Sequence, residues 1–341
     1  MTTTSSRPGR PRAATDTDTD LPAVGAIADV TSRIAASIGR VLVGKPEVVR
    51  VALVTLLAEG HLLVEDVPGV GKTSLAKALA RCLDCSVSRV QFTPDLLPGD
   101  ITGMSIYNRH SSEFEFRPGP VFANVVIADE INRASPKTQS ALLECMAEDQ
   151  VTVDGATYQL AAPFMVVATQ NPVEMDGTFP LPEAQRDRFT ARVSIGYPDP
   201  AAELAMVDEH SASDPLETLR PVTDARTVRD IVDAVKHLHI APEVRQYCVD
   251  IVSATRSLPD LRLGASPRAT LHLVRASRAQ AALAGRHYVV PDDVQAIAVP
   301  VLAHRLVLTP DAQAARRSSA DIVRALVGGL PVPVPAARSG A

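Results

Sequence analysis

The chain has 341 residues, 46% of them hydrophobic and 21% charged, which is the composition of an ordinary globular protein with room for two domains. Its 39 acidic and 34 basic residues give a net charge of −5, which argues against non-specific nucleic-acid binding as the main activity. The sequence has no run of about 18 apolar residues, so no membrane span is predicted, and its four scattered cysteines favour a reducing, cytoplasmic location over a disulfide framework.

The first predicted elements lead up to a glycine-rich turn. Residues 1–22 lack an apolar core and are predicted to form a disordered tail. Apolar positions recur with helical spacing from about residue 24 to 39, and again from 48 to 56. The short apolar run at 61–64 then predicts a buried strand that ends at the turn, and a helix follows the turn as far as residue 83.

The turn is a phosphate-binding motif in the context that it requires, between a strand and a helix. Its glycines allow positive φ angles and close approach of the backbone to a ligand. Lys72 would reach the β- and γ-phosphate oxygens of a nucleotide, and the Thr73 hydroxyl would help to hold Mg²⁺. Asp66 stands where such loops usually have a first glycine, which bears on the entry of the loop more than on phosphate binding. The nucleotide-binding candidates in this loop are Pro68, Gly69, Val70, Gly71, Lys72, Thr73 and Ser74.

Polar residues follow two of the later predicted strands. Asp129 and Glu130 come directly after a buried strand, at its carboxyl end, where open α/β sheets bind ligands. Asp129 would hold Mg²⁺ through water, and Glu130 would orient or deprotonate the attacking water. Asn171 ends the next strand, where its amide would hold the same water; the alternative is a turn asparagine before Pro172. The further strands are predicted at residues 87–92, 125–128 and 164–169.

Two β-hairpins are predicted as insertions into this α/β arrangement. Residues 104–107 and 113–117 alternate between apolar and polar side chains and are joined by a polar turn. Residues 151–153 and 158–160 flank the Asp-Gly pair at 154–155, which is a strong two-residue turn signal.

The character of the sequence changes after Pro198-Asp199-Pro200. Residues 201–327 are predicted to be almost wholly helical, and Ser266 is predicted to cap a helix that starts at Pro267. Arg268 lies in the first turn of that helix, where an arginine opposes the helix dipole and is expected to have an anionic partner. The γ-phosphate of the bound nucleotide is the candidate, which would couple the nucleotide state to the angle between the domains.

Arg186 and Arg188 have no evident role in the site of their own core. An arginine that reaches the phosphate of a neighbouring subunit raises the rate by about 10³–10⁵ in other NTPases, and we expect one of these two residues to act in this way. The alternative for both residues is a solvated charged turn.

With these residues in place, the chain resembles the MoxR family of AAA+ ATPases over residues 24–328. The resemblance rests on the strings at residues 128–144, 150–155, 168–172 and 179–185. It implies that the loop through Lys72 and Thr73 is Walker A and that Asp129 and Glu130 form Walker B. It further implies that Asn171 is sensor 1, that Arg268 is sensor 2, that Arg188 is the arginine finger ahead of Arg186, and that Val43 and Gly44 line the adenine pocket.

The resemblance also implies an α/β fold in which a P-loop AAA+ core, with a parallel sheet and two inserted hairpins, precedes an all-helical lid domain. The expected division is a disordered tail at 1–22, the core at 23–198, the lid at 199–328 and a Pro-rich tail at 329–341. ATP and Mg²⁺ are the implied cofactors. The implied assembly is a homo-oligomeric ring, usually a hexamer, with the hairpins lining its central pore. Its implied work is the chaperone-like remodelling or maturation of a protein client that contains a von Willebrand factor A domain.

Two other functions stay open at this point. Hairpin-inserted AAA+ rings include DNA helicases, so a nucleic-acid motor is the main alternative, although the acidic body of the chain favours a protein client. A nucleotide-gated scaffold with negligible turnover is the third possibility, and the presence of both Glu130 and Asn171 argues against it.

Overall fold

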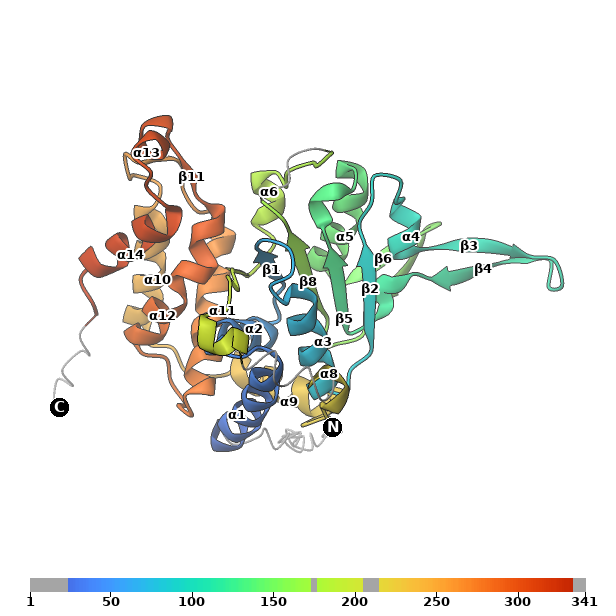
Figure 1. Cartoon of the computed structure of the whole chain (residues 1–341), viewed down its shortest axis with the longest axis horizontal. Helices are drawn as coiled ribbons and strands as arrows, with labels where there is room; N and C mark the ends of the chain where they lie inside the picture. The colour runs from blue at the N-terminus through green and yellow to red at the C-terminus, as the bar shows by residue number, and fades with distance from the viewer. Residues whose placement is uncertain (1–23, 173–176, 205–214, 334–341) are drawn as a thin grey trace, which may run out of the picture.

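The computed structural model describes residues 24–172, 177–204 and 215–333, which form an α/β core beside a largely helical C-terminal region (Figure 1). The predicted tail at 1–22, and residues 334–341 of the predicted Pro-rich tail, lie outside these ranges. Among the helices in the described ranges, none is both long and apolar enough to cross a membrane.

The core is built on a five-stranded sheet in the order β2-β5-β8-β1-β9. The interior strand β5 reads Val-Val-Ile-Ala-Asp and is buried throughout, as expected for a strand that is covered on both faces. All of the pairings are parallel, so the carboxyl ends of the strands meet at one edge of the sheet and the amino ends at the other. The strands are β1 (Leu62–Glu65), β2 (Val87–Gln91), β5 (Val125–Asp129), β8 (Met165–Gln170) and β9 (Ala191–Val193).

Hydrophobic cores lie on both faces of the sheet. Leu62 and Val64 pack into one core, and Leu63, which points the other way, packs into the second. Helices α1, α2 and α3 cover the first face, and α5 covers the second. The helices of the core are α1 (Val24–Val41), α2 (Pro46–Leu57), α3 (Lys72–Cys82), α4 (Pro98–Thr102), α5 (Pro136–Glu148) and α6 (Glu183–Arg186), with 3₁₀ turns η1 (Pro120–Phe122) and η2 (Ile131–Arg133).

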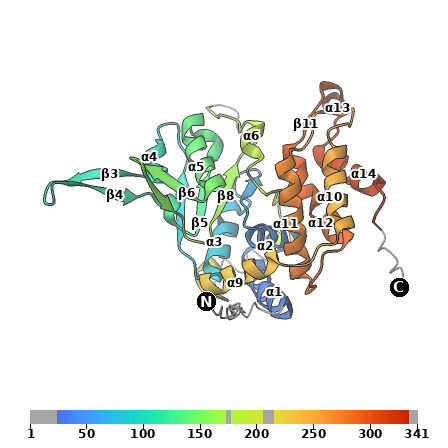
Figure 2. The ribbon, with the colours of Figure 1, turned by 180° about the vertical axis from the view of Figure 1, so that it is seen from behind.

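Both predicted hairpins are present. β3 (Gly103–Asn108) pairs with β4 (Glu113–Pro118), and β6 (Gln150–Val153) pairs with β7 (Ala156–Gln159). In the second hairpin the turn residues Asp154 and Gly155 both have positive φ, as the Asp-Gly pair predicts. The first hairpin extends away from the body of the core, as both ribbon views show (Figures 1 and 2).

The C-terminal region is mostly helical, and the expectation of an all-helical domain is wrong in one detail. A short antiparallel pair joins β10 to β11, with three and two residues, which is too short for a periodic pattern to reveal. Ser266 precedes α11 as predicted, but its side chain makes no capping hydrogen bond. The elements are α8 (Pro215–Thr218), α9 (Ala225–Lys236), α10 (Pro242–Ala254), β10 (Leu261–Leu263), α11 (Pro267–Leu283), α12 (Pro291–Leu302), η3 (Ala303–Arg305), β11 (Val307–Leu308), α13 (Pro310–Ala314) and α14 (Ser319–Gly329).

The C-terminal region packs closely against the core. Helix α8 contacts α1 and α3, and α9 lies between α2 and α11. Helix α12 and the turn η3 contact the edge strand β9. Packing therefore continues across the predicted domain boundary at residue 198, and that boundary stays a prediction.

Candidate active site

The glycine-rich turn joins β1 to α3 and forms one wall of a pocket at the carboxyl edge of the sheet. Gly69 and Gly71 have φ angles of +84° and +92°, in the left-handed region that favours glycine. The space beside Gly69 is open, because a Cβ atom there would meet no heavy atom within 4 Å. The pocket has a volume of about 340 Å³ and is lined by Pro68, Gly69, Gly71, Lys72, Thr73, Ser74, Arg89, Gln91, Asp129, Glu130, Thr169 and Asn171.

Asp66, which replaces the usual first glycine of the motif, ties the loop to the chain that follows β9. Its carboxylate accepts hydrogen bonds from the Ser194 hydroxyl (2.8 Å) and from the amides of Gly196 (2.6 Å) and Val67 (2.8 Å). Burial acts to raise the pKa of this carboxyl group, but the hydrogen bonds from Gly196 and Ser194 act against it, and the pKa of Asp66 lies below its ordinary value. The departure from the motif therefore provides a charged anchor at the entry of the loop.

The ammonium group of Lys72 lies at the same edge of the sheet. It donates hydrogen bonds to the backbone oxygens of Asp66 (2.6 Å) and Gln170 (3.2 Å). Burial lowers the pKa of Lys72, while the negative charges of Asp66, Glu130 and Asp129 act in the opposite direction. A cation held by backbone carbonyls on the wall of an open pocket is well placed to bind phosphate oxygens.

The groups predicted to hold Mg²⁺ lie side by side. The Thr73 hydroxyl donates to the carboxylate of Asp129, with oxygen–oxygen distances of 3.2 and 3.3 Å. Asp129 is buried and also accepts hydrogen bonds from the Thr169 hydroxyl (3.2 Å) and from Nε of Arg89 (2.6 Å). A hydroxyl and a carboxylate are the hard oxygen ligands that Mg²⁺ prefers, so the residues present fit this ion.

Glu130 is held in an uncommon backbone conformation at the rim of the pocket. Its φ angle is +56° and its ψ angle +48°, in the left-handed region that non-glycine residues seldom adopt. Its amide donates to the Thr169 hydroxyl (3.0 Å), which fixes the turn. Its carboxylate accepts a hydrogen bond from Nε2 of Gln91 (2.9 Å) and forms an ion pair with Nε of Arg133 (3.0 Å), and these contacts hold the side chain.

Asn171 follows β8 and lines the pocket together with the other predicted residues. Three further lining residues, Arg89, Gln91 and Thr169, were not among the predicted site residues. A signal for two of them exists in the sequence, because Arg89 and Gln91 are polar residues two apart on a strand and so share one side of it. Only the pairing of β2 with β5 shows that this side faces Asp129.

The segment predicted to line the adenine pocket lies next to the phosphate loop. A Cβ atom on Gly71 would lie 3.7 Å from Cδ1 of Leu42, just ahead of Val43. Gly44 has a φ angle of +74°, and a Cβ atom there would lie 3.6 Å from Cβ of Ala202. The segment that holds Val43 and Gly44 therefore lies near both the phosphate loop and the chain that follows β9, and its contact with the adenine base stays a prediction.

Arg188 and Arg268 lie together, but in a different pocket. That pocket, of about 200 Å³, is also lined by His61 and Thr190, which directly precede β1 and β9. It is therefore at the amino edge of the sheet, opposite the phosphate loop. The five residue steps from His61 to Asp66 span about 16 Å at a rise of about 3.3 Å per residue, which is farther than an arginine side chain extends.

Arg268 therefore lies away from the phosphate loop of its own subunit. Its acidic neighbour is instead Asp187, with 3.9 Å between Nη1 and Oδ2. Helix α11, whose first turn carries Arg268, begins at the amino edge, so the guanidinium cannot reach the carboxyl edge of the same sheet. Arg188 donates from Nη1 to the backbone oxygen of Leu143 (2.6 Å).

The structure separates the two candidates for the arginine finger. Arg186 lines a third pocket, of about 600 Å³, together with Asn171 and Glu65 near the carboxyl edge. Its Nη2 lies 4.0 Å from Oε1 of Glu183. Arg188 is the one that shares the amino-edge pocket with Arg268.

Comparison with known proteins agrees with this architecture. Residues 61–191 match the ATPase family associated with various cellular activities (AAA), and residues 253–326 match the AAA lid domain. A solved structure of a candidate ATPase from Cytophaga hutchinsonii superposes with a TM-score of 0.84 at 36% identity, covering 91% of this chain and 97% of that chain.

Some of the relatives that match over most of their length carry a family name. The chain is 42% identical over 304 residues to the chaperone MoxR1 of Mycobacterium tuberculosis, covering 86% of this chain and 80% of that protein. It is 34% identical to the protein MoxR of Paracoccus denitrificans, with 89% and 95% covered, and 50% identical to the uncharacterized protein YeaC of Bacillus subtilis, with 87% and 93% covered. The chain therefore belongs to the MoxR family of AAA+ ATPases and hydrolyses ATP.

Proposed function

We propose that this ATPase is Mg²⁺-dependent, works as an oligomeric ring and remodels or matures a protein client. The observation that carries the proposal is the separation of two half-sites, with the phosphate-loop pocket at the carboxyl edge of the sheet and Arg188 and Arg268 at the amino edge. A head-to-tail ring brings the amino edge of one subunit to the carboxyl edge of the next. Each complete site then combines the phosphate loop of one subunit with the arginines of its neighbour.

Within one subunit, each residue of the carboxyl edge has a separate task. Lys72 neutralises the negative charge on the β- and γ-phosphates, and the loop amides bind their oxygens. Thr73 and Asp129 would hold Mg²⁺, which when bound supplies further charge neutralisation on the phosphate oxygens. Glu130 and Asn171 orient the attacking water, and Glu130 accepts its proton.

The arginines of the neighbouring subunit complete the site. Negative charge spreads over the transferred phosphoryl group as the bond to the leaving group breaks, and a guanidinium can donate two hydrogen bonds to it at once. The isolated subunit lacks this stabilisation in its own site, so assembly controls turnover. We assign this role to Arg188 and a supporting role to Arg268.

The proposed client is a protein, with a von Willebrand factor A domain as the class that the family resemblance implies, and a hexamer is the implied ring. One relative is named a chaperone, which supports this class of work. The projecting first hairpin exposes aliphatic side chains, including Met104 and Ile106, that suit contact with a polypeptide. Cysteine usage supports a cytoplasmic location as part of the same proposal.

One observation keeps the nucleic-acid motor as a second candidate. Tyr107 and Phe114 on the same hairpin are exposed, and their rings meet edge to face with 5.3 Å between the ring centroids. Exposed aromatic rings can stack on nucleic-acid bases. The test is the mass by light scattering with ATP and Mg²⁺, together with phosphate release with and without single-stranded DNA. We expect a nucleotide-dependent ring whose turnover DNA does not change. Strong stimulation by DNA would make the nucleic-acid motor the leading function, and a monomer with full turnover would contradict the ring.

A further inference from the structure

A single buried arginine joins the C-terminal region to the loop between α6 and β9. Arg305, the last residue of η3, has 1% of its side chain exposed. Its Nε donates a hydrogen bond to the backbone oxygen of Val301 (2.8 Å). Its Nη1 donates to the backbone oxygen (2.9 Å) and to the carboxylate Oδ1 of Asp187. Its Nη2 donates to the backbone oxygen of Phe189 (2.6 Å) and to Nδ1 of His272 (2.7 Å). A guanidinium has five N–H donors in one rigid plane, and each of the five has an acceptor here.

The network has a defined charge state at neutral pH. Burial lowers the pKa of Arg305 to about 10, while the carboxylate of Asp187 acts against the decrease, so the guanidinium stays charged. Burial also lowers the pKa of His272 to about 3, with the charge of Arg305 as a further cause. The imidazole is therefore neutral and can accept a hydrogen bond at Nδ1.

Besides Arg305 and Arg268, Asp187 has a third partner in the C-terminal region, Ser266. The Ser266 hydroxyl lies 2.9 and 2.8 Å from the two carboxylate oxygens and donates to them. Ser266 occupies the N-cap position of α11, where a serine side chain normally accepts a hydrogen bond from the first turn of its own helix. It makes no such bond in this structure and contacts the core instead.

The residue on the other side of Arg188 is held by the same turn. The backbone oxygen of Phe189 accepts hydrogen bonds from Arg305 and from Nε2 of His304 (3.1 Å), and the Phe189 side chain is fully buried. Both chain neighbours of Arg188 are thus bound to η3. The position of the Arg188 backbone is therefore set by the C-terminal region rather than by the core sheet alone.

We propose that Asp187 and Arg305 are positioning residues, which fix Arg188 where it can act on the nucleotide of the neighbouring subunit. The inference rests on the proposed function, because it requires Arg188 to act between subunits. A displacement of about 1 Å in a positioned group can cost about 10²-fold in rate, and a fully paired, buried guanidinium allows little displacement. The same contacts make Arg188 follow any movement of the C-terminal region.

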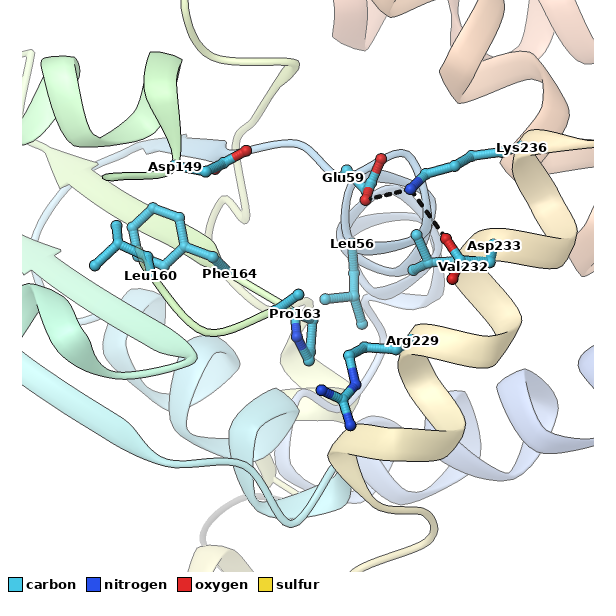
Figure 3. Close-up of a pocket in the computed structure, with 11 residues that line it drawn as sticks. Leu56, Glu59, Asp149, Leu160, Pro163, Phe164, Arg229, Val232, Asp233 and Lys236 are labelled. Atoms are coloured by element: carbon cyan, nitrogen blue, oxygen red, sulfur yellow. Dashed lines mark hydrogen bonds and ion pairs between the residues drawn. The ribbon is translucent and has the colours of Figure 1, made fainter. Parts of the chain in front are cut away.

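A second link between the two regions serves as a matched control. Lys236 ends α9, and its Nζ lies 2.7 Å from Oε1 of Glu59, which lies two residues beyond the end of α2. Figure 3 shows the ammonium group of Lys236 between the carboxylates of Glu59 and Asp233. This pair also crosses from the core to the C-terminal region, but both side chains are 44% exposed, so solvent screens it. If every cation that links the two regions were equally important for turnover, removing Lys236 would lower kcat as much as removing Arg305.

The test uses full-length Arg305→Lys and Asp187→Asn subunits, with Lys236→Met as the control. For each we would measure ATP affinity, assembly by light scattering, and phosphate release alone and after mixing with excess Glu130→Gln subunits. The Glu130→Gln subunit binds ATP and hydrolyses it poorly, but it retains the native network around Arg188. It can therefore supply a well-positioned arginine to its neighbour.

We expect Arg305→Lys and Asp187→Asn to keep ATP affinity within about twofold and to lose about 10- to 100-fold in kcat, with turnover recovered on mixing. Lys236→Met should retain native turnover. Loss of ATP affinity, failure of mixing to restore turnover, or an unchanged kcat in both variants would overturn the positioning role. If one of the two variants does not fold, the other still tests the positioning role.

Failure of the proposed function would have a separate signature. In that case Arg188→Ala subunits would not recover turnover with the same Glu130→Gln partner under confirmed co-assembly. If Arg188→Ala is rescued and Arg305→Lys is not, the intersubunit arginine stands and the positioning role falls.

Discussion

The two edges of the parallel sheet are assembled in different ways. At the carboxyl edge, Asp129 ends β5, Glu130 follows it, and Lys72 begins the helix after the loop that follows β1, so the sheet itself brings them together. At the amino edge, Arg188 lies in a core loop and Arg268 at the start of a helix in the C-terminal region. Their meeting depends on the contact between the two regions.

We expect this difference to separate nucleotide binding from hydrolysis. The groups proposed to hold the phosphates all belong to one subunit and lie at one edge of its sheet, so we expect the affinity for ATP not to depend on the neighbouring subunits. Arg188 and Arg268 lie at the edge of the sheet opposite the phosphate loop of their own subunit, so we expect turnover to depend on the next subunit in the proposed assembly. Changes at the two edges should therefore give different phenotypes.

Removal of the phosphate-loop cation should have the largest effect. Lys72→Ala removes the ammonium on the pocket wall, and we expect loss of measurable ATP binding and of all turnover. Binding of a fluorescent ATP analogue measures the effect, with the exposed Lys77 on α3 changed to alanine as a matched control. Retained micromolar affinity in Lys72→Ala would remove this loop from the binding site.

The amino edge should show the opposite pattern. Arg188→Ala should bind ATP normally and lose about 10³-fold or more in turnover, as arginine fingers do in related NTPases. Mixing with Glu130→Gln subunits should restore phosphate release, because that subunit offers an intact Arg188. Arg186→Ala is the control, since Arg186 lies in another pocket, and we expect it to keep most of its activity. Equal losses in both variants would contradict the assignment of the finger.

The next effect belongs again to the carboxyl edge. Glu130→Gln retains the shape of the side chain but cannot accept a proton, so we expect normal ATP affinity with turnover reduced by about 10²–10⁴. Single-turnover phosphate release separates this loss from slow product release. Normal turnover in this variant would exclude Glu130 from the chemical step.

The contrast between the edges also marks how far the sequence predicts the site. The strands, both hairpins and the phosphate loop follow from periodicity, turn residues and a motif, all of which are local. The carboxyl-edge residues could be predicted because parallel strands place their following residues together. The sequence also shows that Asp66 departs from the motif, but it does not predict that the partners of Asp66 lie in the chain after β9.

The amino edge could not be derived in the same way. Its contacts join residues far apart in the chain, and no local pattern encodes the docking of η3 on the loop before β9. Ser266 illustrates the limit, because its sequence context predicts a helix cap, whereas the packing of two regions turns its hydroxyl toward Asp187. The five bonds of Arg305 are likewise invisible until the regions are packed.

The smallest predicted effect concerns the hydrogen bonds of Asp66, which hold the phosphate loop at the carboxyl edge of the sheet. The pKa of Asp66 is below its ordinary value, so its carboxylate stabilises the fold above the unfolded-state pKa of about 4, and this stabilisation is lost as pH falls through the lower folded-state pKa. Asp66→Asn should therefore cost about 1–2 kcal/mol at pH 7 and progressively less toward pH 3. Urea unfolding across this range measures it, with exposed Asp29→Asn as the control. A cost independent of pH would show that shape, rather than charge, holds the loop to the chain after β9.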